Sequence, residues 1–278
     1  MGTLYIVATP IGNLEDITLR ALRVLREVNL IAAEDTRHTR KLLSHFKITT
    51  PLVSYHSHNQ ARRGPELLAR LQRGENIALV SDAGTPGFSD PGTDLVALAW
   101  EAGFTVEAVP GPAAAVAALS MSGFKGDVTF VGFLPRKEGK RLELLKKLAD
   151  EPRVLIFYEA PQRLACTLTE MTSVFTRRQV LVVRELTKLH QQCWRGALPE
   201  VAASVRGQEI KGECTLVLSC PQGKPEPQVA VADHLIKLAR NSKLSGRRLA
   251  DLAAAELSLP RRRVYQTYLS LKTQGLIP

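Results

Sequence analysis

Short apolar runs alternate with helical patterns along most of the chain, and this alternation limits the possible folds more than any other feature. Apolar runs at residues 4–8, 76–80 and 105–109 have the length of buried strands and are followed by Gly or Pro. Between the runs, apolar residues recur at helical spacing, as in residues 17–28. Strands that alternate with helices in this way predict an α/β protein with mostly parallel sheet.

A second series of the same kind follows the Pro110-Gly111-Pro112 break. Its strand candidates lie at residues 128–133, 154–158, 180–183 and 214–219, with helical patterns between them. We therefore expect two α/β lobes with mixed, mostly parallel sheets, residues 1–111 and 112–222.

The last part of the chain differs in pattern and in charge. Residues 221–227 have the composition of a linker, and three helical patterns follow, at 229–241, 246–257 and 261–272. Residues 229–278 hold nine Lys/Arg and three Asp/Glu, so +6 of the formal net charge of +10 lies there. We expect a small basic helix-turn-helix-like module that suits a polyanionic partner. The alternatives are a solvated basic face, or helices that pack on the lobes or assist dimerisation.

Composition narrows the class of protein. The four cysteines show no C-x-x-C spacing, which indicates reduced thiols and neither a disulfide framework nor a zinc site. His56 and His58 lack ligand partners at metal-site spacing, so no metal is expected. The apolar start is too short for a signal peptide, and no apolar stretch reaches membrane-spanning length. We expect a soluble, cytoplasmic protein with no membrane partner.

Three Gly/Pro-rich segments, residues 9–13, 82–92 and 110–112, each follow a predicted strand. In α/β sheets, ligands bind beyond the carboxyl ends of strands, so these loops predict a cleft, although each could be an ordinary turn. The chain contains neither G-x-x-x-x-G-K-[ST] nor G-x-G-x-x-G after a strand, which argues against a nucleoside triphosphatase and a standard dinucleotide site.

Charged clusters also follow predicted strands. In Glu34-Asp35-Thr36-Arg37-His38, the side chains could face a substrate, or Asp35 or Thr36 could cap the following helix, and the two interpretations are compatible. Glu159 with Arg163, and residues 184–188, could likewise lie in the cleft or form surface ion pairs.

Taken together, these motifs resemble the tetrapyrrole (corrin/porphyrin) methylase superfamily and, within it, the branch that methylates the 16S ribosomal RNA. The resemblance covers essentially the whole chain. It rests on residues 4–18, on Ala33-Glu34-Asp35-Thr36-Arg37, on residues 81–86 with 90–92, and on residues 110–112, 157–159 and 184–188.

The resemblance implies a homodimeric enzyme that binds S-adenosylmethionine in a cleft between its lobes. The implied reaction is 2′-O-methylation of the ribose of a cytidine, position 1402, in 16S rRNA or the 30S subunit. The positions that match cofactor-binding residues are Pro10, Ile11, Gly12, Asp82, Thr85, Ala113, Ala114, Tyr158, Leu186 and Cys214. Only the Asp of the superfamily's Gly-Asp-Pro loop is retained, and Ala113 and Ala114 lack hydroxyls that relatives often have there.

Roles in the reaction follow as hypotheses. A general base would assist the weakly acidic 2′-hydroxyl, with Asp35 the first candidate and Glu34 and Glu159 behind it. The predicted RNA-binding residues are Arg37, Arg163, Lys188, Arg247, Arg248, Arg261, Arg262 and Arg263. The competing functions are C-methylation of a porphyrin- or corrin-like ring and a non-catalytic nucleic-acid-binding regulator.

Overall fold

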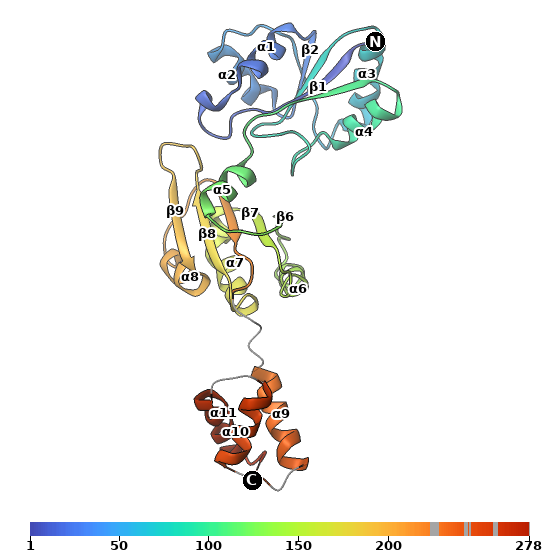
Figure 1. Ribbon diagram of the computed structural model, residues 1–278. Coiled ribbons are helices and arrows are strands. Elements are labelled where there is room, and N and C mark those ends of the chain that lie inside the picture. Colours follow the sequence, from blue (N-terminus) through green and yellow to red (C-terminus); the bar gives the residue numbers. More distant parts are fainter. Residues whose placement is uncertain (223–227, 242–243, 245, 258–260, 278) are drawn as a thin grey trace. The chain divides into compact units, whose positions relative to one another are not determined.

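The computed structural model describes residues 1–222, 228–241, 244, 246–257 and 261–277. They form two compact units, Met1–Gln222 and Gly223–Pro278 (Figure 1). The first unit contains two five-stranded sheets, and the second is helical.

The first sheet is wholly parallel, in the order β3-β2-β4-β1-β5. Its strands are β1 (Thr3–Val7), β2 (Leu30–Ala33), β3 (Leu52–Ser54), β4 (Ile77–Val80) and β5 (Thr105–Val109). Its helices are α1 (Leu19–Glu27), α2 (Thr36–His45), α3 (Gln60–Gln72) and α4 (Thr93–Glu101). Helices α1 and α2 cover one face of the sheet, and α3 and α4 cover the other (Figure 1).

Local signals explain where these helices begin. Thr18 caps α1 by accepting a hydrogen bond from the Ala21 amide at 3.0 Å. The sequence predicts that Pro65 opens the third helix, whereas α3 begins at Gln60 and contains Pro65. A turn at 56–60, in which the Gln60 amide bonds the His56 carbonyl at 3.0 Å, starts the helix before the proline.

The second sheet is mixed, in the order β6-β7-β10-β8-β9. Its strands are β6 (Val128–Phe133), β7 (Val154–Glu159), β8 (Gln179–Arg184), β9 (Gln192–Ala197) and β10 (Cys214–Leu218). Helix α5 (Ala114–Ser122) packs on one face, and the other face carries α6 (Glu138–Lys147), α7 (Pro161–Val174) and α8 (Leu198–Val205).

The predicted α/β class with two sheet-containing lobes is confirmed. Of the eight strand pairings in residues 1–222, five are parallel. The three antiparallel pairings all lie in the second sheet, where the pairing of β6 with β7 is the one parallel pairing between the described strands. Strand β9 had no apolar run to predict it, because its half-exposed edge position does not require one.

The second unit contains α9 (Gln228–Asn241), α10 (Arg247–Leu257) and α11 (Arg261–Thr273). These helices agree with the three predicted patterns, and they enclose a core of their own that includes Leu235, Leu249 and Tyr268. Residues 223–227 of the predicted linker lie outside the described residues. No helix in the described parts of the chain is long and apolar enough to cross a bilayer.

Candidate functional site

The loops that follow β1, β2, β4 and β5 meet at the carboxyl edge of the first sheet. The helix after β4 lies on the opposite face from the helices after its two neighbours, β1 and β2. Adjacent strands whose connections leave to opposite faces open a crevice at their carboxyl ends. The loop after β4, which contains Asp82, therefore lies where such a fold binds ligands.

Backbone and side-chain hydrogen bonds tie the three Gly/Pro-rich loops together. Thr9 and Gly84 exchange two backbone hydrogen bonds, at 2.8 and 3.0 Å. The Thr85 hydroxyl donates to the Pro112 carbonyl at 3.3 Å. At Gly111 a Cβ atom would come within 2.9 Å of the Ala8 side chain, so glycine lets the third loop approach the first.

Within the first unit, these loops and the second sheet enclose a cavity of about 470 Å³. That volume is typical of a pocket for a cofactor-sized molecule. Its apolar lining includes residues from both lobes, namely Ile11, Ala83, Phe88, Ala113, Ala114, Phe133, Tyr158, Leu186 and Cys214. We call it the first cavity.

The charged lining of the first cavity is entirely acidic. Its five carboxylates belong to Glu34, Asp82, Asp90, Glu159 and Glu213, and none of the residues described as lining it is Lys, Arg or His. Like charges in a partly desolvated space disfavour one another. Such a cavity attracts a ligand that carries positive charge and donor groups.

Asp90 and Glu213 are the two lining carboxylates that the sequence-based assignment missed. Burial, reinforced by the nearby carboxylates of Glu34, Asp82 and Glu213, raises the pKa of Asp90 from 3.8 to about 6, while a hydrogen bond from Ser81 opposes the shift. A carboxylate with a pKa near neutrality is better suited to accept a proton than an ordinary one. The Asp90-Pro91-Gly92 motif was visible in the sequence, but only as part of the resemblance.

A strained loop presents Asp90 to the cavity. Ser89, immediately before it, has a left-handed backbone with φ of 65°. Phe88, which precedes Ser89, stacks on Phe130 of β6 with ring centroids 4.1 Å apart. This contact between the lobes fixes the loop over the cavity, and non-glycine residues in that conformation are concentrated at functional sites.

Glu34 and Asp35 are neighbours with different environments. Glu34 lines the cavity, and burial raises its pKa. Asp35 lies outside the lining and caps α2, accepting from the Arg37 amide at 2.8 Å. Hydrogen bonds from Arg37 lower the pKa of Asp35 to about 2. A carboxylate of such low pKa is a poor proton acceptor, so the structure favours Glu34 over Asp35.

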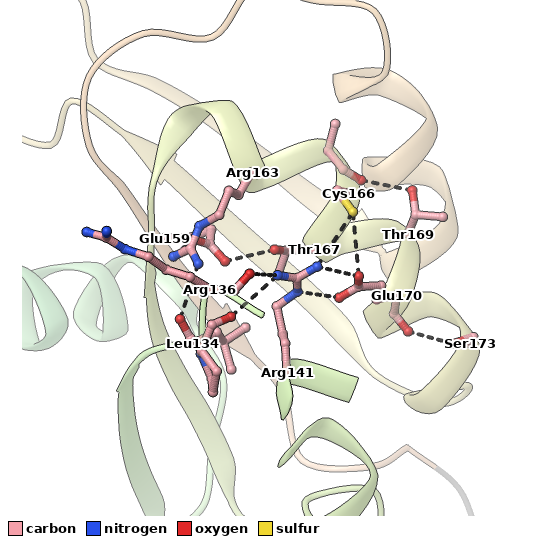
Figure 2. A network of polar contacts seen from close by, with 12 residues as sticks. Leu134, Arg136, Arg141, Glu159, Arg163, Cys166, Thr167, Thr169, Glu170 and Ser173 are labelled. Atoms are coloured by element: carbon pink, nitrogen blue, oxygen red, sulfur yellow. Dashed lines mark hydrogen bonds and ion pairs between the residues drawn. The ribbon is translucent and has the colours of Figure 1, made fainter. Parts of the chain in front are cut away.

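Glu159 also lines the cavity, but its carboxylate is already engaged (Figure 2). One oxygen accepts from the Ala160 amide at 2.8 Å and meets Arg163 at 2.5 Å, and the other accepts from the Thr167 hydroxyl at 2.8 Å. Arg163 also donates to the Leu134 carbonyl at 3.3 Å. These bonds anchor the start of α7 and leave Glu159 and Arg163 poorly placed to act on a substrate.

The same close-up shows a second buried ion pair, between Arg141 and Glu170 (Figure 2). Arg141 and Glu170 approach to 2.6 Å, with side chains that are 6% and 10% exposed. The pair joins α6 to α7 behind Glu159 and does not line the cavity. Its role is structural.

Eight of the ten predicted cofactor-binding residues line the first cavity: Ile11, Asp82, Thr85, Ala113, Ala114, Tyr158, Leu186 and Cys214. Pro10 and Gly12 line a second cavity, of about 320 Å³, on the other side of Asp82. The remainder of that lining is Thr9, Leu14, His38, Thr39, Lys41, Leu42, Ser81, Asp82 and Lys188.

Lys188 belongs to a strained loop between the two cavities. Glu185 and Thr187, on either side of Leu186, have left-handed backbones with φ of 52° and 67°. Lys188 bonds Glu185 at 2.8 Å and Glu213 at 3.1 Å, so its charge is already compensated. Gly12 lies against Lys188, where a Cβ atom would overlap the lysine side chain.

The predicted RNA-binding arginines of the second unit are exposed where they are described. Arg247 and Arg248 begin α10, and Arg261 begins α11, 3.7 Å from Asp251. The side chains of Arg262 and Arg263 lie outside the described part of the structure. Among the described residues, no group of His, Cys, Asp or Glu side chains is arranged to hold a metal ion.

The sequence and the fold are both similar to those of known methyltransferases. Residues 3–202 match the family model described as Tetrapyrrole (Corrin/Porphyrin) Methylases. Among solved structures, the fold is similar to the cobalamin biosynthetic enzyme cobalt precorrin-4 methyltransferase, with TM-score 0.58 and 17% identity over 78% of this chain and 94% of that one. It is also similar to uroporphyrin-III C-methyltransferase from Thermus thermophilus complexed with S-adenosylhomocysteine, with TM-score 0.56 and 22% identity over 78% and 97%.

Other relatives are much more similar to this chain in sequence than these solved structures are. The chain is 50% identical to "Ribosomal RNA small subunit methyltransferase I" of Synechocystis sp., over 99% of this chain and 100% of that protein. It is 49% identical to the protein of that name from Thermotoga maritima, over 79% of this chain and 99% of the relative. The chain therefore belongs to the tetrapyrrole (corrin/porphyrin) methylases and, within them, to the family of proteins named ribosomal RNA small subunit methyltransferase I.

Proposed function

We propose that the protein transfers a methyl group from S-adenosylmethionine to the ribose 2′-hydroxyl of a cytidine, position 1402, in 16S rRNA. The observation that carries the proposal is an acid-lined cavity between the lobes of a chain that is 50% identical to a named rRNA methyltransferase. The named relatives supply the RNA substrate, and the cavity supplies the place for the methyl donor.

The chemistry of the lining fits this cofactor. When bound, S-adenosylmethionine supplies an electrophilic methyl group on a positively charged sulfur, and it also carries an ammonium group and ribose hydroxyls. Asp82 and Asp90 can balance the positive charge and accept hydrogen bonds. Apolar residues such as Ile11 and Leu186 suit the adenine ring and exclude water.

The proton of the 2′-hydroxyl needs an acceptor, and Asp90 is our first choice. It lines the cavity with a pKa of about 6, and Glu34 is the second carboxylate with a raised pKa. General-base assistance of this kind contributes about 100- to 10,000-fold in rate. Asp35 and Glu159, expected from the sequence, have oxygens committed to Arg37 and to the start of α7.

RNA would be held mainly by positive charge outside the cavity. Exposed Arg247, Arg248 and Arg261 suit phosphates, as would the neighbouring Arg262 and Arg263 that the sequence adds. Two of the predicted RNA-binding residues lie near the cavities. The side chain of Arg37 is 86% exposed, and Lys188 lines the second cavity. We further propose a homodimer that works in the cytoplasm without a metal, with the oligomeric state to be read by light scattering.

Incubation with methyl-labelled S-adenosylmethionine tests the function directly. The acceptors are 30S subunits that lack the modification, naked 16S rRNA and a porphyrinogen, each in a separate reaction. We expect label in RNA, mapped to one ribose by resistance of its 3′ phosphodiester to alkali. Label only in the porphyrinogen would support ring C-methylation, and no turnover with any acceptor would support a binding protein without catalysis.

A further inference from the structure

The second cavity lies directly beside the first, and their charges differ. Asp82 lines both, so the two cavities adjoin at this residue. The charged lining of the first cavity is acidic, whereas the second has Asp82 as its one acid, with Lys41, His38 and a Lys188 whose charge is compensated by Glu185 and Glu213. Lys41 is therefore the cation of the second cavity that has no ion pair among the described residues, and two adjoining cavities of different charge suit two different ligands.

Helix α2 extends the basic side of the second cavity. His38, Thr39, Lys41 and Leu42 line it, and Arg37 and Arg40 are exposed beside them. The helix contains no Asp or Glu. Arg37 is paired with Asp35, whereas no ion pair of Arg40 or Lys41 is found among the described residues. Uncompensated exposed cations that edge a cavity are suited to phosphates.

The helix is also held rigidly against the methyl-donor site. The Asp35 amide, at the cap of α2, donates to Asp82 at 3.0 Å. The Asp82 amide in turn donates to Glu34 at 3.4 Å. A group that docks on α2 therefore has a fixed position relative to the first cavity, as transfer between two bound molecules requires.

We propose that the second cavity and the basic side of α2 bind the ribose-phosphate backbone of the RNA strand that accepts the methyl group. Lys41 contacts a phosphate at the cavity, and Arg40 contacts the strand beside it. This inference rests on the proposed function, since it assumes that the methyl acceptor is RNA. It assigns the acceptor strand to the first unit, in addition to any contact that the second unit makes.

Charge reversal tests the proposal with Lys41→Glu and, as an independent second variant, Arg40→Glu. The matched control is Lys146→Glu, because Lys146 is exposed on α6 and lines neither cavity. The readouts are KM for unmodified 30S subunits, KM for S-adenosylmethionine, affinity for a fluorescent 16S rRNA fragment at several salt concentrations, and circular dichroism for folding.

We expect Lys41→Glu and Arg40→Glu each to raise KM for the 30S subunit at least tenfold. The slope of log affinity against log salt should fall by about 1 for each variant. KM for S-adenosylmethionine should change less than twofold, and Lys146→Glu should behave as the wild type. Folded α2 variants with wild-type RNA affinity and salt slope would overturn the inference.

The RNA-affinity measurements distinguish failure of this inference from failure of the proposed function. A wild-type protein that never labels RNA would refute RNA methylation, yet the RNA-fragment titrations would still compare α2 variants with the control. Active wild type together with α2 variants that match the control would refute the acceptor site alone.

Discussion

Replacing Asp90 with Asn removes the one cavity carboxylate whose pKa is raised to about 6. Asn keeps the size of the side chain and remains neutral at every pH. The first effect to expect is on stability, and its sign follows from linkage. The folded-state pKa of Asp90 is above the ordinary 3.8, so the ionised carboxylate destabilises the folded protein. This destabilisation of the wild type is absent below pH 3.8, where the carboxyl group is protonated, and is fully present above pH 6.

The size of the effect follows from the same two values. A gap from 3.8 to about 6 corresponds to at most roughly 3 kcal/mol, because each pH unit is worth about 1.4 kcal/mol. Asp90 is half-buried, so solvent reduces this to about 1–2 kcal/mol. Asp90→Asn should therefore match the wild type near pH 4 and be about 1–2 kcal/mol more stable at pH 8.

Urea unfolding of the ligand-free protein between pH 4 and 8 measures this difference. Asp94→Asn is the control, since Asp94 is an exposed carboxylate in the first turn of α4. It should cost a few tenths of a kcal/mol at all these pH values. If Asp90→Asn gives a difference in unfolding free energy that does not change with pH, burial of the Asp90 charge is not what the structure indicates.

The same substitution tests the catalytic role. Loss of the proton acceptor should lower kcat about 100- to 10,000-fold and abolish the rise of kcat/KM with pH near 6. A variant that is more stable yet far less active shows that the raised pKa serves the reaction. Near-normal kcat with both substrates saturating would remove Asp90, and Glu34→Gln would then be the next variant to measure.

Three further outcomes follow from contacts in the structure. Asp35→Asn should leave kcat within about threefold, since general-base losses are far larger. Asn can still cap α2, but the stabilisation that depends on the Asp35 charge, present above pH 4 and fading toward pH 2, should disappear from the pH dependence of thermal unfolding. Glu170→Leu should cost about 3–5 kcal/mol in urea unfolding because Arg141 remains buried without its partner, and a double Leu variant should recover most of that. Deletion of residues 223–278 should leave cofactor affinity within about twofold by calorimetry but weaken RNA binding and reduce its salt slope.

The sequence predicts the cleft well because its signals are local. A buried strand followed by Gly or Pro is visible in a single short window, as at residues 9–13 and 110–112, and parallel strands end at one edge. Family resemblance then added positions such as Leu186 and Cys214, which line the first cavity although nothing in their own segments marks them.

Side-chain roles at the cavity were harder to predict, because they depend on direction and on distant partners. Glu34 and Asp35 are adjacent, yet one enters the cavity and the other caps α2. Glu159 ends a strand as a catalytic carboxylate would, but Thr167, two helical turns further on, accounts for one of its oxygens. Asp90 owes its position to Phe88 stacking on Phe130 in the other lobe, which no local pattern reveals.

Glu159 and Glu213 are paired with Arg163 and Lys188, but the other three carboxylates that line the first cavity, those of Glu34, Asp82 and Asp90, have no ion pair among the described residues. Holding these three charges close together in a partly desolvated space costs free energy in the absence of a ligand. The cost is reduced when a positively charged molecule enters, because the carboxylates that add to the effect of burial on the pKa of Asp90 also attract the cation. Binding of that cation must then lower the pKa of Asp90, since the two effects are linked. Without a ligand Asp90 is ionised only above about pH 6, and binding of the methyl donor would extend its ionised state to lower pH. Cofactor binding and ionisation of the base are therefore coupled, and the affinity for S-adenosylmethionine should rise with pH through this range.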